Sequence, residues 1–402
     1  MRQTDVAIAG AGLAGSATAA MLARAGIDVL LIDPRESYPP DFRCEKLDTD
    51  QIEILKKTGL DGAVMKAATP DLSLSIARFG RLLDRKEGRQ IGIYYQDLVN
   101  TVRAEVPRHV FVNAKVASVA TGDERQTVTL STGEQIAARL LVLATGLNLS
   151  LRHELGLTRT VTSETHSIAI GFDIKPAGRN EFDFSALTCY SESPASRVAY
   201  VAFFPIGTST RANLFVYRGL DDPWLTRFRD APKATLLAAM PGLARLVGPF
   251  DIEGPVKIRP IDLYVTDGHR QPGVVLLGDA FATSCPAAGT GAGKALMDVQ
   301  LLCNKHVAQW LATPGMSAEK IAAFYDDPEK LAYDAFSTDK AHALKSMSID
   351  TALPWAARRW ARFVFHGSRG ALRAAHRRIT AKPAPGRASA AVLASAPSRR
   401  VL

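Results

Sequence analysis

A glycine-rich turn close to the first residue constrains the fold of this chain most, because it predicts a strand–turn–helix unit that binds phosphate. The segment 5–9, which contains the apolar run 6–9, predicts a short buried strand, and the alanine-rich segment 13–24 predicts a helix. Three glycines stand at this junction. Gly10 makes the tight turn, Gly12 lets the backbone approach a pyrophosphate, and Gly15 permits close packing of helix on strand.

The start of the predicted helix is an anion site, where Leu13 and Ala14 present unpaired N–H groups. A second predicted strand over 28–32 ends at Asp33, about 20 residues after the glycines. Its carboxylate would accept hydrogen bonds from an adenosine ribose. A GxGxxG pattern alone also occurs in ordinary glycine turns. In this strand–turn–helix–strand context it predicts dinucleotide binding, without distinguishing FAD from NAD.

A second glycine-rich segment lies far along the chain, after another predicted buried strand over 274–277. A helix that begins near Gly291 would point its N–H groups at a ligand beside this segment. A purely structural strand–loop–helix corner is the alternative reading. The residues of this second segment are Gly278, Asp279, Ala280, Pro286, Gly289, Gly291, Ala292 and Gly293.

Together with Arg259-Pro260-Ile261, the second segment resembles the flavin-contacting motif of the class A FAD-dependent monooxygenases, the para-hydroxybenzoate hydroxylase-like aromatic hydroxylases. The resemblance spans roughly residues 4–340. It implies that Asp279 holds the ribityl chain of FAD, and that Pro286 and the turn over 289–293, with Ala292, pack beside the isoalloxazine. The helix start would stabilise the negative charge that two-electron reduction places on the flavin N1–C2 edge.

The resemblance implies further cofactor contacts. Arg43 falls where the family places an arginine near the FAD phosphates, and Gln96 occupies a position that the family fills with Arg or Gln. Val116, at the end of an expected strand over 112–116, would offer backbone groups to the adenine. Each of the three could equally be an ordinary surface or core residue.

Two positions depart from the family pattern. Thr145 replaces the aspartate of an Asp-Gly motif that the family links to both FAD and NAD(P)H use, although Gly146 and Arg152 remain. Gly146 is retained as a predicted FAD contact. Ala282 stands where a histidine is often found. The electron donor is therefore left open between NADPH or NADH and a separate reductase.

The overall pattern predicts an α/β fold: a Rossmann-like FAD-binding domain of the GR2 type, an inserted antiparallel β-sheet substrate domain and a C-terminal helical region. The expected ranges are 1–75, 95–165 and 259–340 for the FAD-binding domain, 76–94 and 166–258 for the substrate domain, 341–380 for a basic helical region and 381–402 for a disordered tail.

In this family the inserted sheet roofs the flavin and forms the substrate pocket. Along the segment 200–207 alternate side chains would face opposite sides of a strand, with Val201 and Phe203 on the side away from Tyr200. The candidate pocket residues are Tyr200, Phe204, Pro205 and His166, each of which could equally belong to the sheet core. The sequence identifies no catalytic base, no metal-binding cluster and no nucleophilic triad.

The net charge of +9 is concentrated in the last part of the chain, since residues 341–402 hold 12 Lys/Arg and one acid, Asp350. Five arginines at spacings of four and seven would share one helical face: Arg358, Arg362, Arg369, Arg373 and Arg377. Trp360, Phe363 and Val364 lie largely opposite. We expect a terminal helix that packs its aromatic side on the body; an anionic membrane surface or an acidic partner is the alternative. The chain shows no nucleic-acid reader motif.

The remaining composition favours a cytoplasmic enzyme, with peripheral membrane association through the basic helix as the variant. The first 30 residues are occupied by the nucleotide motif, and no run of 18 apolar residues occurs. The four cysteines show no metal or redox spacing, so we expect reduced thiols: Cys44, Cys189, Cys285 and Cys303.

Three functions remain in view. The resemblance favours an FAD-dependent monooxygenase that hydroxylates an apolar, aromatic small molecule through a flavin 4a-hydroperoxide, with molecular oxygen and NADPH or NADH as co-substrates. A reductase of isoprenoid double bonds is the second, because 200–205 also resembles the Tyr-x-Trp-x-Phe-Pro motif of geranylgeranyl reductases, with Ala202 in place of the tryptophan. A non-catalytic flavin-binding protein is the third.

Overall fold

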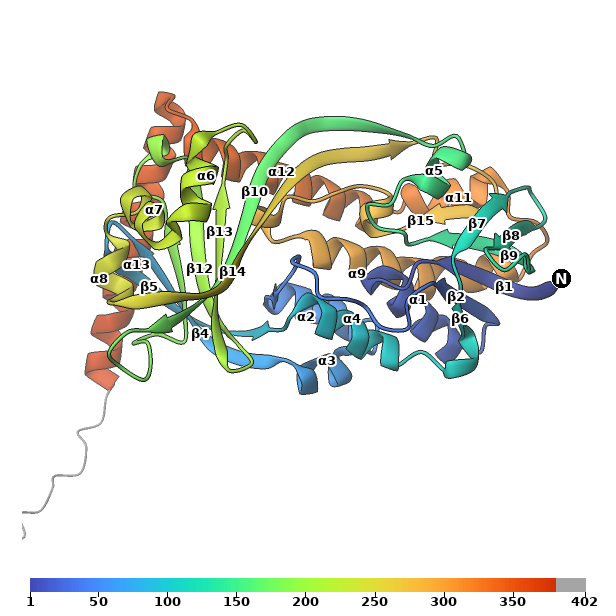
Figure 1. The fold of residues 1–402 in the computed structure, drawn as a ribbon, viewed down its shortest axis with the longest axis horizontal. Coiled ribbons are helices and arrows are strands. Elements are labelled where there is room, and N and C mark those ends of the chain that lie inside the picture. Colours follow the sequence, from blue (N-terminus) through green and yellow to red (C-terminus); the bar gives the residue numbers. More distant parts are fainter. Residues whose placement is uncertain (381–402) are drawn as a thin grey trace, which may run out of the picture.

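Two β-sheets, joined by long strands and surrounded by helices, make up the protein (Figure 1). The computed structural model describes residues 1–380, without the side chains of residues 72, 86, 89, 366 and 369–380. The predicted disordered tail over 381–402 lies outside the described residues. The α/β fold class is confirmed.

The first sheet carries the N-terminal motif. Its strands are β1 (Arg2–Ala9), β2 (Val29–Asp33), β6 (Phe111–Asn113), β7 (Val116–Ala120), β8 (Gln126–Leu130), β9 (Gln135–Leu143) and β15 (Val274–Leu276). They lie in the order β6-β2-β1-β9-β8-β7, and β15 also pairs with β9. β6, β2, β1, β9 and β15 run parallel, which fits their continuous apolar sequences. The strands predicted over 5–9 and 28–32 are confirmed.

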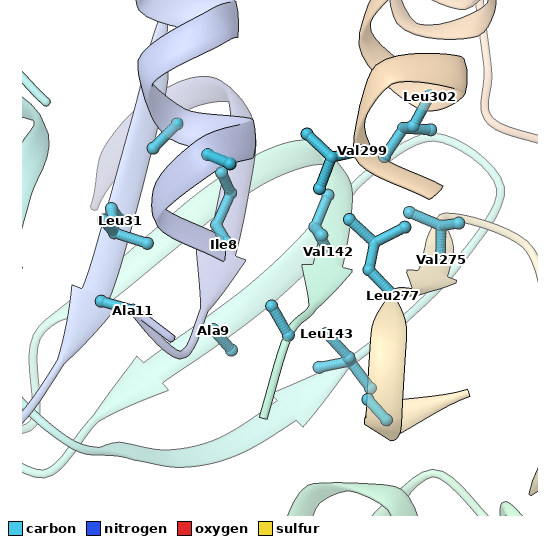
Figure 2. Packing of buried hydrophobic residues seen from close by; sticks show 14 of the residues in the cluster. Ile8, Ala9, Ala11, Leu31, Val142, Leu143, Val275, Leu277, Val299 and Leu302 are labelled. Atoms are coloured by element: carbon cyan, nitrogen blue, oxygen red, sulfur yellow. The ribbon is translucent and has the colours of Figure 1, made fainter. Parts of the chain in front are cut away.

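Helices cover this sheet closely. α1 (Leu13–Arg24), whose predicted bounds are confirmed, packs against α4 (Tyr95–Ala104) and α9 (Gly291–Leu301). Figure 2 shows part of the buried cluster that contains Ile8 and Val142 of the strands and Val299 and Leu302, which lie on α9 and the π-helical segment Leu302–Val307 after it. All four are fully buried, and burial of each side chain stabilises the fold by about 1.5–3 kcal/mol.

The second sheet has eight strands: β3 (Lys46–Leu47), β4 (Thr69–Arg78), β5 (Arg81–Gly92), β10 (Thr158–Pro176), β11 (Ala186–Tyr190), β12 (Val198–Ile206), β13 (Ser209–Val216) and β14 (Phe250–Asp267). Their order is β14-β10-β13-β12-β11-β4-β5-β3. All neighbours are antiparallel except β11 and β4, which are parallel. One face packs on α6 (Pro223–Asp230), α7 (Pro232–Ala239) and α8 (Leu243–Val247) around Phe172, Phe203 and Phe228.

β10 and β14 pair along most of their length and run from the second sheet toward the first (Figure 1). The expected domain boundaries at 75/76, 165/166 and 258/259 therefore fall inside β4, β10 and β14 rather than between elements. The side-chain alternation of a strand does not change where it passes from one sheet region to another. For this reason the sequence contains no signal for the passage.

The strand expected over 112–116 is wrong. β6 ends at Asn113 and β7 begins at Val116, with a turn between them in which the Ala114 N–H donates to the Val112 carbonyl (3.0 Å). The alternation of apolar Val112, Ala114 and Val116 with polar residues continues across this turn, so periodicity alone cannot show that the strand is interrupted there.

The remaining helices are α2 (Thr49–Lys56), α3 (Asp61–Ala67), α5 (Ser150–Glu154), α10 (Ala308–Leu311), α11 (Ala318–Tyr325), α12 (Pro328–Ile349) and α13 (Leu353–Thr380). α12 contacts both α9 and β12, so it links the two sheets, and α13 packs along β5. Among the described residues, no helix combines the length and apolarity needed to span a bilayer.

α13 meets the body through part of its aromatic side. The Phe79 ring lies 5.4 Å from Phe363 and 6.2 Å from Trp360, between centroids. Trp360 and Val364 nevertheless remain 61% and 62% exposed, because the helix lies across only the edge region of the sheet. Arg358 points to solvent, and Arg362 lines a cavity described below. The side chains of Arg369, Arg373 and Arg377 lie outside the described residues.

Candidate cofactor and substrate site

One cavity of about 780 Å³ lies between the two sheets, and both glycine-rich segments open into it. This volume is in the upper part of the range of about 300–1,000 Å³ found for ligand pockets. The predicted cofactor residues that line it are Gly10, Gly12, Leu13, Ala14, Asp33, Arg43, Gly146, Gly278, Asp279, Pro286, Gly289, Gly291 and Ala292. Gly15, Gln96 and Val116 are not among the lining residues.

The geometry of the first turn requires its glycines. Gly10 has φ = 100°, and a Cβ added there would lie 2.6 Å from the Ala144 carbonyl oxygen. A Cβ on Gly15 would lie 1.9 Å from the Gly10 oxygen, so Gly15 serves the packing of α1 behind the turn. A Cβ on Gly12 would meet nothing within 4 Å and would occupy cavity space. Gly12 therefore leaves room for a ligand.

The first N–H groups of α1 face the cavity without a capping side chain. Gly12 is the N-cap residue, and Leu13 and Ala14 line the cavity. Asp33, almost fully buried at the end of β2, accepts hydrogen bonds from the N–H groups of Ala11 and Arg35 (both 2.9 Å). The turn thus holds a carboxylate beside an uncapped helix start. The ribose contact of Asp33 stays a prediction.

The turn after β15 is held by a buried ion pair. The Gly278 N–H donates to Asp298 Oδ2 (3.0 Å), and Lys330 Nζ lies 2.6 Å from Asp298 Oδ1. Both side chains of this pair are 1% exposed. Sequence reasoning missed them, because Asp298 and Lys330 lie on α9 and α12 with no motif around them. They fix the position of Gly278 and thereby of the neighbouring Asp279.

The second helix start also faces the cavity. α9 begins at Gly291 as predicted, and its N-cap residue Thr290 makes no side-chain capping bond. Gln51 Nε2 donates to the Gly289 carbonyl (2.9 Å) and so secures the preceding turn. Gly293 is needed for a different reason: a Cβ there would lie 2.1 Å from the Tyr333 hydroxyl of α12.

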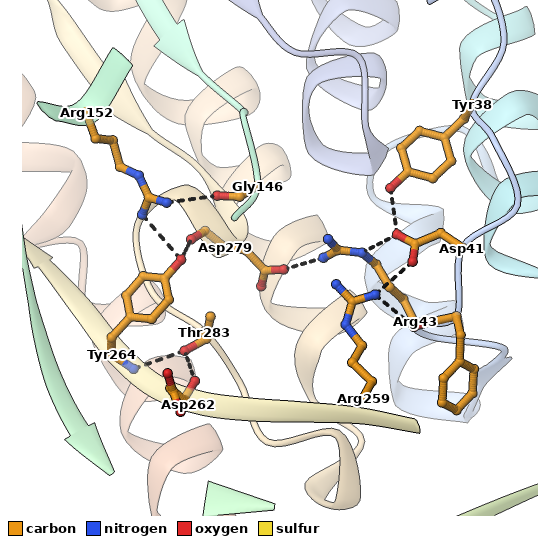
Figure 3. Close-up of polar contacts among 11 residues, drawn as sticks. Tyr38, Asp41, Arg43, Gly146, Arg152, Arg259, Asp262, Tyr264, Asp279 and Thr283 are labelled. Atoms are coloured by element: carbon orange, nitrogen blue, oxygen red, sulfur yellow. Dashed lines mark hydrogen bonds and ion pairs between the residues drawn. The ribbon is translucent and has the colours of Figure 1, made fainter. Parts of the chain in front are cut away.

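A chain of ion pairs crosses the middle of the cavity wall (Figure 3). Arg43 Nη1 lies 2.7 Å from Asp279 Oδ2, and Arg43 Nε lies 2.7 Å from Asp41 Oδ2. Arg259 Nη1 lies 2.7 Å from the other Asp41 oxygen, and the Tyr38 hydroxyl donates to Asp41 (3.0 Å). Two arginines and two aspartates thus alternate along the wall. Sequence reasoning found Arg43 and Asp279 and missed the roles of Asp41 and Arg259.

The pairs keep both partner types ionised. Burial disfavours the charged form of Asp41, but Arg43 and Arg259 outweigh it and lower the pKa of Asp41. Burial likewise opposes the charge of Arg43, and Asp279 and Asp41 outweigh it, so that the pKa of Arg43 is raised. The wall therefore presents fixed charges to a ligand at neutral pH.

Arg152 ties the end of β9 to the second segment. Its guanidinium, 1% exposed, donates to the carbonyls of Gly146 (3.3 Å) and Ala280 (3.0 Å) and to the Thr266 hydroxyl (3.3 Å). Tyr264 stacks near it and donates from its hydroxyl to the Asp279 carbonyl (2.6 Å) (Figure 3). Arg152, which is retained from the family pattern, thus connects the end of β9 with the turn after β15 through hydrogen bonds.

Two predicted FAD contacts lie off the cavity. Gln96 is half-buried on α4, while its neighbour Tyr95 lines the cavity. Burial raises the pKa of Tyr95, so this side chain is a neutral phenol. Val116 opens β7 at the edge of the first sheet. For both residues, a contact with the cofactor stays a prediction without support from the cavity geometry.

The inner face of β12 forms the far wall of the cavity. Tyr200, Ala202 and Phe204 line it, whereas Val201 and Phe203 pack in the opposite core beneath α6–α8. The predicted alternation of this strand is therefore confirmed. The wall presents aromatic and aliphatic groups to the space beyond the second segment.

Tyr200 joins this wall to the second segment. Its hydroxyl donates to the Ala287 carbonyl (2.6 Å), and its ring lies 4.9 Å from Phe215 and 5.7 Å from Tyr190. Burial strongly raises the pKa of Tyr200, so the hydroxyl stays protonated and acts as a donor. Asn213 and Thr188 add polar groups to the same wall.

The other two pocket candidates do not line the cavity. A Cβ on Gly92 would lie 2.0 Å from the Pro205 carbonyl, which shows Pro205 packed against β5. His166 is fully buried in its own cluster, with Nδ1 3.0 Å from the Ser163 hydroxyl and its ring 5.0 Å from His342. Burial, together with the nearby Lys345 charge, lowers the pKa of His166 to about 4. This histidine is a neutral core residue at pH 7.

Sequence reasoning missed a buried acid in the cavity wall. Glu45 is 2% exposed and lines the cavity, and Arg211 Nε lies 3.0 Å from its Oε2. Burial raises the pKa of Glu45, and the charge of Arg211 partly counteracts this. Glu45 lies two residues after Arg43, but nothing in the local pattern separates it from a surface acid.

Comparison with known proteins identifies the family to which the chain belongs. A family model described as FAD binding domain matches residues 3–313. A menaquinone reductase of Mycobacterium tuberculosis is 30% identical over 164 residues, 38% of this chain and 40% of that protein. The aklavinone 12-hydroxylase of Streptomyces peucetius is 24% identical over 338 residues, 73% of this chain and 65% of that protein. The crystal structure of p-nitrophenol 4-monooxygenase from Pseudomonas putida has a TM-score of 0.72 at 16% identity, covering 91% of this chain and 95% of that one.

Proposed function

This chain belongs to the FAD binding domain family, and on that premise we propose that it is an FAD-dependent monooxygenase that hydroxylates an apolar, aromatic small molecule. The observation that carries the proposal is that Gly12, Asp279 and Tyr200 all line the same cavity. A cofactor held along Gly12 and Asp279 would meet a substrate held against Tyr200. The likeness to aklavinone 12-hydroxylase supports this reaction type.

The cavity residues fit FAD. Gly12 and Gly289 leave open space where any other residue would place a Cβ, and the starts of α1 and α9 are free of capping side chains. Asp33 would hold the adenosine ribose, the start of α1 with Arg43 the phosphates, and Asp279 the ribityl chain. The residues proposed beside the isoalloxazine are Pro286, Gly289, Gly291 and Ala292. When bound, FAD supplies two-electron redox chemistry and the activation of oxygen.

The residues of the chain would form the substrate pocket in which this reaction takes place. The inner face of β12, with Phe215 of β13, forms a mostly apolar wall that would exclude water and position an aromatic ring. Tyr200 is held in place by its bond to the Ala287 carbonyl. The overall reaction would place one oxygen atom of O₂ on the substrate and release the other as water. Its two electrons would come from NADPH or NADH.

The test uses the purified full chain loaded with FAD. Anaerobic mixing with NADPH or NADH, with and without a panel of aromatic ligands, is followed by admission of ¹⁸O₂. We expect ligand-accelerated reduction of the flavin and one ¹⁸O atom in the product, detected by mass spectrometry. Failure to bind FAD, or the absence of any labelled product, contradicts the proposal. Flavin that NADPH, NADH and an added flavin reductase all fail to reduce would point to a non-catalytic flavin-binding protein.

A reductase of isoprenoid double bonds is the second candidate. It is favoured by the likeness to menaquinone reductase over 164 residues, although the matched segment is only 40% of that protein. Ala202, which replaces the tryptophan of the reductase motif, lines the cavity. Reduction of an isoprenoid substrate under strict anaerobiosis would identify this activity, whereas product formation that requires oxygen excludes it.

The electron donor and the cellular setting belong to the proposal as well. Thr145, in place of the family aspartate, lines the cavity and donates to the Asn148 carbonyl (3.3 Å). Comparing NADPH with NADH in the anaerobic experiment decides the donor.

We expect a cytoplasmic enzyme. A peripheral contact of the basic α13 with an anionic membrane or an acidic partner is tested by co-sedimentation with anionic and neutral vesicles.

A further inference from the structure

A small side cavity of about 60 Å³ adjoins the main one. Four residues line both cavities: Tyr190 of β11, Leu344 and Met347 of α12, and Arg362 of α13. Since these side chains line both spaces, the two cavities are neighbours. A cavity needs about 10–15 Å³ for each water, so the side cavity has room for a group of a few heavy atoms.

Three arginines surround the side cavity. Arg78 ends β4, while Arg359 and Arg362 lie three residues apart on one face of α13. None of the described residues that line this cavity is acidic. Among the side chains that the structure describes, none forms an ion pair with any of the three arginines.

The contacts of these arginines fix their positions without neutralising them. Arg78 Nε donates to the Ser191 carbonyl (2.9 Å), and Arg359 Nη1 donates to the Asp350 carbonyl (2.6 Å). Carbonyl oxygens satisfy N–H groups but carry no full charge. The two guanidiniums are therefore held in place by carbonyl groups, without an ion-pair partner among the described side chains.

The electrostatics of Arg78 show that the like charges are close together. Burial lowers the pKa of Arg78, and the charges of Arg359 and Arg362 lower it further. Glu192 acts in the opposite direction, but its Oε1 accepts a hydrogen bond from the Gly242 N–H (2.8 Å). Positive charges that converge on one space repel each other, and an anion bound there would relieve this repulsion.

We propose that this three-arginine side cavity binds the carboxylate of the substrate whose aromatic part occupies the main cavity. Guanidinium groups match a carboxylate in shape and charge, and their hydrogen bonds to it are stronger than those to a neutral amide. The proposal rests on the proposed function for the identity of the main-cavity ligand. It narrows the substrate class to aromatic acids and makes α13 one wall of the substrate site.

Matched pairs of probes test this in the FAD-loaded full chain. The pairs are benzoate and benzamide, 2-naphthoate and 2-naphthamide, and anthracene-2-carboxylate and its amide, with binding followed by changes in the flavin absorbance spectrum. For at least one pair we expect the acid to bind about tenfold or more tightly than the amide. In Arg362→Met the preference should disappear while amide binding is unchanged, and Arg362→Lys should restore part of it.

Arg358→Met is the matched control, because Arg358 lies on the same helix, faces solvent and does not line either cavity. It should leave the acid preference unchanged. An equal loss in both variants, or no pair with a preferred acid, overturns the proposal. Inorganic phosphate that binds alone and removes the preference would assign the cavity to a free anion and also overturn it.

Failure here is distinguishable from failure of the proposed function. Uptake of FAD is measured on the protein alone. Oxygen-dependent hydroxylation is then measured with the amides as well as with the acids as substrates. Hydroxylation of both with equal kcat/KM would leave the monooxygenase assignment intact and refute the carboxylate site.

Discussion

Arg43 and Asp279 stand 236 residues apart in the chain, yet their side chains meet at 2.7 Å in the cavity wall. Arg43 lies in the loop between β2 and β3, and Asp279 belongs to the turn after β15. Their pairing holds the loop before β3 against the turn after β15. The proposed FAD site is therefore assembled before any ligand arrives, which reduces the ordering that binding has to supply.

Replacing Asp279 should weaken FAD binding. Asp279→Ala removes a charged acceptor and leaves Arg43 with one carboxylate partner fewer, so we expect FAD affinity to fall about 10- to 100-fold. Quenching of free FAD fluorescence on titration with protein measures this. The control is Asp326→Asn, whose carboxylate pairs with Arg270 (2.6 Å) on the surface and outside the cavity. Equal affinities in both variants would refute the role of Asp279.

Gly12 and Gly15 should respond differently to the same substitution. Gly12→Ala places a methyl group in open cavity space, so FAD affinity should fall while the free energy of unfolding changes by less than about 0.5 kcal/mol. Gly15→Ala drives a methyl group against the Gly10 backbone and should cost at least about 1–3 kcal/mol. Denaturant unfolding and FAD titration on both variants check this. Similar stability losses in the two would show that Gly12 is structural.

The ion pair beneath Gly278 should show strong coupling. Lys330→Met leaves the Asp298 carboxylate buried and unpaired, which we expect to destabilise the fold by about 3–5 kcal/mol. Adding Asp298→Asn should recover part of this loss, because the new amide oxygen still accepts from the Gly278 N–H. A double-mutant cycle by denaturant unfolding measures the coupling. Simple additivity would contradict it.

His166 should make stability depend on pH below neutrality. Its pKa is lowered to about 4 by burial and by the neighbouring Lys345, against an ordinary value of 6.5. Between these values the unfolded chain binds a proton that the folded chain does not, so its contribution to stability is full above pH 6.5 and falls as the pH drops toward 4. The total is up to about 3 kcal/mol.

Unfolding of the wild type and of His166→Asn at pH 7 and at pH 4.5 measures this contribution. The wild type should lose more stability across the interval than the variant does. If the two lose equal amounts, His166 does not titrate with the lowered pKa.

The parts of the fold that sequence could predict are those with local causes. The glycines of the first turn, the bounds of α1, the start of α9 and the two faces of β12 each depend on a few neighbouring residues. The family resemblance then identified Arg43 and Asp279, and the FAD family is confirmed. Each of these features depends on a backbone requirement or a side-chain periodicity that can be recognised in a short stretch of sequence.

The missed residues depend on contacts between distant elements. Asp298 and Lys330 lie on two different helices. Glu45, directly before β3, pairs with Arg211 of β13. No spacing rule connects such pairs. The boundary inside β10 was missed for a related reason: a strand keeps its alternation wherever it goes, so only the three-dimensional path reveals that it serves both sheets.

β10 and β14 have a mechanical consequence for the molecule. The two strands, 19 and 18 residues long, run as one ribbon through both halves and hydrogen-bond to each other at both ends. Neither half can be cut free without severing that ribbon. Heating should thus melt the described body in one cooperative step, and attempts to express its two halves as separate proteins should yield insoluble chains.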